Sequence, residues 1–220
     1  MLLLRFVFLL LVCALTTDLA AKPAVAKIKI SPPTVLYKTF PAGRPPMHAK
    51  GVDKGEAGLC QTEIACQVGL EADTSRLNLG EAHATLHSVN FTVSVKITIW
   101  CQEGYTPAIR DHEETHRAIS EHYYAKAHAV ARGLADDALT RELPLTGQPK
   151  AEALDRALTQ LQAQLLDDFM REVYQRSEFA QDRFDAITDH GRNGITNTDA
   201  MAQSIREEIA HWRTPGGEKR

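Results

Sequence analysis

The stretch 89–100 most constrains the fold, because its apolar and polar residues alternate without a break. Period-two alternation with many β-branched residues predicts a strand that turns one face to a core. Residues 82–88 are expected to pair with this strand across a short turn, giving an antiparallel sheet whose apolar face needs a cover. The apolar positions are Val89, Phe91, Val93, Val95, Ile97 and Ile99.

Two long helical patterns follow and would supply that cover. The first runs over 107–132: Thr106 and Pro107 suit a helix start, and Gly133 suits its end. The second runs over 151–179 and has apolar residues at steps of three and four, which is typical of a core-facing helix. The apolar residues of the second pattern are Leu154, Leu158, Leu161, Leu165, Phe169 and Val173.

Shorter elements complete the expected fold. Strands are predicted over 26–30 and 34–40, and a third helix over 198–212. We therefore predict an α+β domain, with a small antiparallel sheet packed against two long helices.

The first helical pattern contains His112-Glu113-Glu114-Thr115-His116, which has the form His-Glu-x-x-His. In a helix with about 3.6 residues per turn, His112 and His116 stand one turn apart on one face and can bind one ion. Glu113 lies about 100° further around the helix, which places it beside the water of the ion rather than among the ligands. The string predicts a zinc (Zn2+) site with Glu113 as the general base.

A catalytic zinc site usually needs a third protein ligand and keeps one open position. His122 completes the spacing His-Glu-x-x-His-x-x-Gly-x-x-His, but Ile119 stands where a glycine would end the helix. Asp185 and His190 lie in a polar segment further along the chain and are the other candidates. The residues alone leave the third ligand open.

The polar segment reads Phe184-Asp185-Ala186-Ile187-Thr188-Asp189-His190-Gly191. With the upstream helix motif, it resembles a family of secreted bacterial proteins, domain of unknown function 922, which are predicted zinc-dependent proteases. That family pairs a His-Glu-x-x-His helix with an aromatic-Asp-x-x-Thr-x-His-Gly segment, and the resemblance covers roughly residues 84–194. It implies a zincin-like fold with His190 as the third zinc ligand. Asp185 is the alternative, as an oxygen ligand or as the acceptor that holds the other N–H of a ligand histidine.

We therefore expect a metallopeptidase that hydrolyses a peptide or protein substrate with a zinc-activated water. One alternative is a secreted zinc-binding or scaffolding protein without catalysis, for example with both His122 and His190 among four ligands. Another is a helical interaction domain without metal. Arg117, Tyr123 and Tyr124 are candidates to donate a hydrogen bond to the substrate carbonyl, and the sequence does not rank them.

Residues 1–26 have the pattern of a secretory signal peptide, in which Arg5 precedes an apolar run over 6–15 and small residues follow. That run is shorter than the roughly 20 residues that span a membrane. We expect cleavage after Ala21 or Ala26, and a soluble protein exported to the periplasm or the extracellular space.

The rest of the chain divides by composition. N-terminal strands and a Pro/Gly-rich extended segment are expected over 27–58, the metallopeptidase domain over 59–213 and a frayed tail over 214–220. The formal net charge is −3 and no basic cluster stands out, which argues against nucleic acid as a partner. In an oxidising compartment one disulfide is expected, with its pairing open among three cysteines: Cys60, Cys66 and Cys101.

Overall fold

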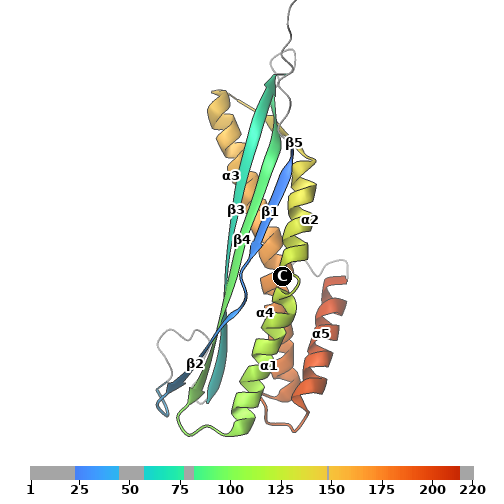
Figure 1. Cartoon of the computed structure of the whole chain (residues 1–220). Helices are drawn as coiled ribbons and strands as arrows, with labels where there is room; N and C mark the ends of the chain where they lie inside the picture. The colour runs from blue at the N-terminus through green and yellow to red at the C-terminus, as the bar shows by residue number, and fades with distance from the viewer. Residues whose placement is uncertain (1–22, 45–56, 77–81, 148, 214–220) are drawn as a thin grey trace, which may run out of the picture.

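The computed structural model describes residues 23–44, 57–76, 82–147 and 149–213, and places one long sheet against a layer of helices (Figure 1). The sheet is built on β4 (Ala82–Gln102), a strand of 21 residues. Along one side β4 pairs antiparallel with β3 (Gly58–Arg76). Along the other it pairs with three short strands: β1 (Val25–Ile30) and β2 (Thr34–Phe40), both parallel, and β5 (Glu142–Leu145), antiparallel.

The α+β class is confirmed at this level, but the prediction of a small antiparallel sheet is wrong. The sheet is mixed, because β1 and β2 run parallel to β4, and it is not small, because β3 and β4 have 19 and 21 residues. The strands expected over 26–30 and 34–40 are present as β1 and β2. Their direction of pairing was not readable from local pattern, since it is set by partners about 60 residues away along the chain.

The segments 82–88 and 89–100, expected as two strands, form one strand with a bulge. Ala72 of β3 pairs with Leu86 and Glu71 pairs with Ser88, so His87 is the extra residue. One inserted residue reverses the phase of a strand, which is why the two alternating patterns looked like separate strands. The bulge keeps the apolar residues on both sides of it in the core: Ala82, Ala84, Leu86, Val89, Phe91 and Val93.

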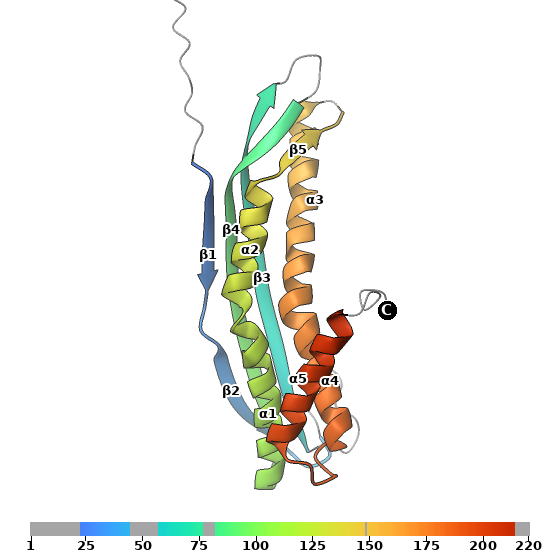
Figure 2. The same ribbon diagram turned by 90° about the vertical axis from the view of Figure 1, so that its right-hand side faces the viewer.

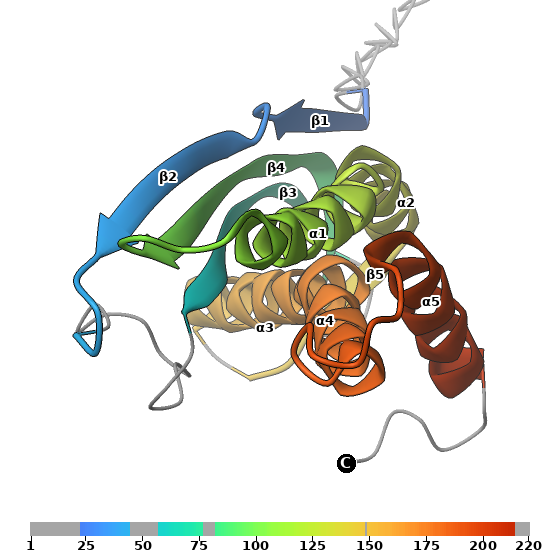
Figure 3. The same ribbon diagram turned by 90° about the horizontal axis from the view of Figure 1, so that it is seen from below.

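The helices lie on one face of the sheet, with α1 and α2 next to β4 and α5 on the outside (Figures 2 and 3). None of the described helices is long and apolar enough to cross a membrane. In chain order they are α1 (Pro107–Tyr124), α2 (Ala127–Leu139), α3 (Lys150–Met170), the π-helical turn η1 (Arg171–Gln175), α4 (Arg176–Thr188) and α5 (Asn197–Arg213).

The helix expected over 107–132 is interrupted, and Gly133 lies inside α2 rather than at its end. A tighter turn of the 3₁₀ type follows α1, in which Lys126 N donates a hydrogen bond to Tyr123 O, three residues earlier. Beyond this turn, α2 packs a row of small residues on β4 and β1. The buried residues of that row are Ala127, Ala131, Ala135 and Ala138.

The helix expected over 151–179 continues further than predicted. No glycine or proline stops the chain after Lys150, and helical structure runs through η1 to Thr188. Residues 184–188 therefore belong to the last turn of a helix and not to a loop that follows one. The third helix is present as expected, over Asn197–Arg213.

Two of the three apolar clusters among the described residues bear on the site. The larger of these two lies between the sheet, α2 and α3, where the rings of Phe91 and Phe169 stand 5.9 Å apart. Each fully buried side chain of this size contributes about 1.5–3 kcal/mol by transfer from water. The smaller joins α1, α4 and α5, and consists of Ile119, Tyr123, Ala180, Phe184 and Ala200. It supports the candidate site, because Phe184 directly precedes Asp185 and Ile119 lies one helical turn after His116.

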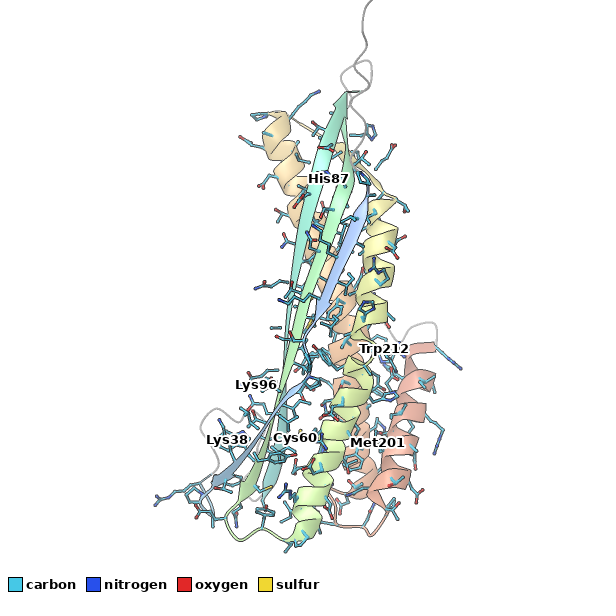
Figure 4. The ribbon with its side chains drawn as sticks, in the orientation of Figure 1. Lys38, Cys60, His87, Lys96, Met201 and Trp212 are labelled. Carbon is cyan, nitrogen blue, oxygen red and sulfur yellow. The ribbon has the colours of Figure 1, made fainter. Side chains whose placement is uncertain are left out.

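The three described cysteines carry free thiols, so the expected disulfide is wrong. In the register of the sheet, Cys60 pairs with Ile99, Cys66 with Val93 and Cys101 with Gly58, so no two cysteines face each other. Burial raises the pKa of the Cys66 thiol to about 11, which keeps it protonated and unreactive near neutral pH. Cys60 lies toward α1, whereas Lys96 points away from the helices on the other face of the sheet (Figure 4).

Several sequence predictions fall outside the described residues. They include the signal peptide up to residue 22, the segment 45–56 of the Pro/Gly-rich region and the tail 214–220. β1 begins at Val25. Cleavage after Ala26 would remove the first two residues of this strand, and cleavage after Ala21 would leave it intact.

Candidate metal centre

The motif residues lie on α1 as predicted, and all three are buried. His112, Glu113 and His116 are 8%, 6% and 7% exposed. Burial of two histidines and a glutamate on one helix is costly unless each has a partner. The partner of the two histidines comes from the last turn of α4.

Three ligand atoms converge between α1 and α4. His112 Nε2 and His116 Nε2 each lie 3.0 Å from Asp185 Oδ1, and the two nitrogens are 3.3 Å apart. Within the described part of the chain, this is the one group of three or more His, Cys, Asp or Glu side chains close enough to hold a metal ion.

The spacing of these atoms fits a small divalent ion. Ligand atoms about 2.0–2.1 Å from a tetrahedral zinc ion stand about 3.3 Å from one another. The observed separations of 3.0–3.3 Å are close to that value. Without a metal, both histidines can donate Nε2–H to Asp185 Oδ1, and this hydrogen-bonded arrangement is the alternative to a metal site.

Ring packing holds the two imidazoles in place. The ring of Phe184 lies 4.9 Å from that of His112 and 5.0 Å from that of His116, and the two histidine rings are 4.9 Å apart. Phe184 precedes Asp185 in α4, so one helical turn supplies both the carboxylate and the apolar wall behind the histidines. Gln181, one turn earlier, contributes a further hydrogen bond to His116.

The charges of the site are coupled. Burial lowers the pKa of His116, but the hydrogen bond and negative charge of Asp185, with Glu113 nearby, outweigh burial and raise it. Burial raises the pKa of Asp185, but the hydrogen bonds from His112 and His116 outweigh it and hold that pKa well below its usual range. Asp185 is therefore ionised at neutral pH, as a metal ligand must be.

The turn after α4 folds back over His112. Asp189 and His190 both have positive φ, at 49° and 53°, which costs roughly 1–2 kcal/mol for each residue. Hydrogen bonds offset this cost, among them His190 N to Asp185 O at 3.0 Å. At Gly191 (φ 79°) a Cβ atom would lie 3.4 Å from His112 Nδ1, so the backbone passes close to the imidazole.

The structure brings His190 next to the metal-binding group but not into it. His190 Nδ1 lies 3.8 Å from Asp185 Oδ1, and its side chain is 52% exposed. Asp185 therefore has the better geometry for a third ligand, and His190 as that ligand stays a prediction. His112 Nδ1 is buried with no hydrogen-bond partner among the described residues.

His122 stands away from the group. α1 continues through Tyr124, so the helix does not end at Ile119 as the longer histidine spacing requires. The ring of His122 instead contacts that of Tyr123, with centroids 5.1 Å apart. Burial lowers the pKa of His122, and the charge of Lys126 lowers it further.

The three residues proposed as hydrogen-bond donors to the substrate carbonyl have other partners. Tyr123 donates to Glu208 Oε2 at 2.8 Å, and Tyr124 donates to Ser31 O at 2.7 Å. Arg117 bonds to two glutamates of its own helix. Their side chains serve packing and ion pairing in this conformation.

Asp182, which lies on α4 with Glu178, was missed by the sequence analysis. Asp182 and Glu178 lie one and two turns before Asp185. Burial raises the pKa of each carboxyl, and the negative charge of Asp182 raises the pKa of Glu178 further, as that of Asp185 does for Asp182. The spacing of four and three residues from Glu178 through Asp182 to Asp185 places these carboxylates on one face of a helix. This could be recognised only once 176–188 was known to be helical.

Comparisons of the chain with protein-family models, with curated proteins and with solved structures found no match. The resemblance to domain of unknown function 922 therefore stays a prediction, and the site must be judged on its geometry.

Proposed function

We propose that the chain is an exported zinc-dependent metallopeptidase, with zinc held by His112, His116 and Asp185. The observation that carries the proposal is the convergence of three ligand atoms within 4.8 Å of one another, next in sequence to a buried glutamate. Two imidazoles and a carboxylate form a ligand set typical of catalytic zinc sites, which keep one position open.

The protein groups would divide the work of hydrolysis. Zinc at this site would polarise the scissile carbonyl and make a water molecule more acidic. Glu113 accepts the proton of the attacking water on its carboxylate and then donates it to the leaving amine nitrogen. Phe184 excludes solvent behind the two imidazoles, and Gln181 fixes the ring of His116.

The test is hydrolysis of an internally quenched peptide library by the zinc-loaded protein and by Glu113→Gln. Glutamine keeps the size of the side chain but cannot carry the proton, so we expect roughly 10²–10⁴-fold slower turnover with unchanged zinc content. Equal rates in the two proteins would contradict the role of Glu113. Cleavage that persists after zinc removal by a chelator would contradict the proposed mechanism.

A further inference from the structure

The start of β3 crosses α1 directly over the Glu113 side chain. A Cβ atom on Gly58 would lie 2.5 Å from Glu113 Oε1, 2.8 Å from Cγ and 2.9 Å from Cδ. Cβ atoms essentially never come within 3.0 Å of another residue, so only a glycine fits there while Glu113 keeps its position. No other described glycine would bring a Cβ within 3.0 Å of a neighbour.

Both sides of this contact are held in place. Gly58 pairs with Cys101 of β4, and the preceding carbonyl, Ala57 O, accepts a hydrogen bond from Gln102 N at 2.7 Å. Glu113 lies inside α1, between residues of the hydrogen-bonded helix, and is 6% exposed. The strand cannot move away without losing sheet hydrogen bonds, and the helix cannot move without carrying His112 with it.

The close approach of β3 and α1 continues along the strand through small side chains. Cys60 follows on the same face as Gly58, and burial and the charge of Glu113 raise the pKa of its thiol. Thr62 comes next, and its hydroxyl lies 2.8 Å from that of Ser120, two helical turns beyond Glu113. The glycine therefore belongs to a continuous seam that sets the distance between strand and helix.

We propose that Gly58 is the positioning residue for Glu113, because its missing side chain creates the space in which the carboxylate lies. The inference rests on the proposed function in one respect, namely that Glu113 acts as the general base. The atoms that a Cβ would meet belong to a flexible side chain and not to backbone. Gly58→Ala should therefore displace the carboxylate while leaving the fold and the three ligand atoms in place.

The contact itself is tested without any activity, by a double-mutant cycle on unfolding. Midpoints of denaturant unfolding are measured in chelator for wild type, Gly58→Ala, Glu113→Ala and the double variant. In the Glu113→Ala background the new methyl group has room, and Gly58→Ala should raise the midpoint by restricting the unfolded chain. In the wild-type background Gly58→Ala should not raise the midpoint, because the new methyl group meets the Glu113 side chain. An equal shift in both backgrounds would overturn the proposal.

The consequence for chemistry is tested on the peptide that wild type cleaves fastest in the library screen. Gly58→Ala should lower kcat about 10²-fold, the effect of a misplacement of about 1 Å, with KM and zinc content unchanged. The matched control is Gly69→Ala on the same strand, where the nearest atoms to a Cβ lie at an ordinary 3.7 Å. We expect it to keep the wild-type rate.

An unchanged kcat in Gly58→Ala, or an equal loss in Gly69→Ala, would overturn the positioning role. If wild type cleaves no peptide, the proposed function fails. The unfolding cycle then still decides whether Gly58 makes room for Glu113.

Discussion

Asp185 is the residue on which the site depends, because a single oxygen meets both histidine nitrogens at 3.0 Å. Sequence spacing could predict the pair of histidines, since one helical turn places them together. It could not predict the carboxylate, which comes from about 70 residues further along the chain. The choice between Asp185 and His190 depends on where α4 ends, and helical periodicity is a poor guide to helix ends.

The coupling of His116 with Asp185 predicts an unusual pH dependence for the metal-free protein. The raised pKa of His116 contributes stability below its unfolded value of about 6.5, which is lost as pH rises through the folded value. The lowered pKa of Asp185 contributes stability above its unfolded value of about 3.9, which is lost as pH falls through the folded value.

The pair should therefore stabilise the metal-free protein most between about pH 4 and 6.5. Thermal unfolding of wild type and Asp185→Asn in chelator, measured across this range and up to pH 8, checks the prediction. The gain in stability on adding zinc should show the opposite trend and grow toward pH 8, because zinc binds neutral imidazole. A wild-type advantage in chelator that increases steadily to pH 8 would contradict the account.

At the scale of elements, one buried carboxylate links α5 to α1, the helix that carries the His-Glu-x-x-His residues. Glu208 is fully buried, accepts a hydrogen bond from Tyr123 at 2.8 Å and forms an ion pair with Arg176. Tyr123 lies on the same stripe of α1 as His116. The position of α5 is therefore coupled to the helix that carries the metal-binding histidines.

Removal of one partner from this network should be costly. Arg176→Met leaves the Glu208 charge buried without its cation, and we expect a loss of about 3–5 kcal/mol in the free energy of unfolding. The matched control is Arg183→Met, which breaks the more exposed pair between α4 and α5 formed with Glu207. That pair should contribute no more than about 1 kcal/mol. Equal losses in urea unfolding would show that burial of Glu208 is not what matters.

At the scale of the whole molecule, local patterns predicted the helices and strands better than their arrangement. The alternation in 89–100 and the apolar stripe of α3 were readable because each follows the period of one element. The parallel pairing of β1 and β2 and the free thiols follow from contacts far apart in sequence. The bulge at His87 changed the phase of the pattern, so one long strand looked like two.

The zinc content of the purified protein, after expression with ample zinc, tests the central claim most directly. We predict about one zinc per chain, lost in His112→Ala, His116→Ala and Asp185→Ala and retained in His122→Ala. Absence of zinc from wild type would contradict the metal site and leave a hydrogen-bonded cluster. Zinc retained in Asp185→Ala but lost in His190→Ala would contradict the ligand set.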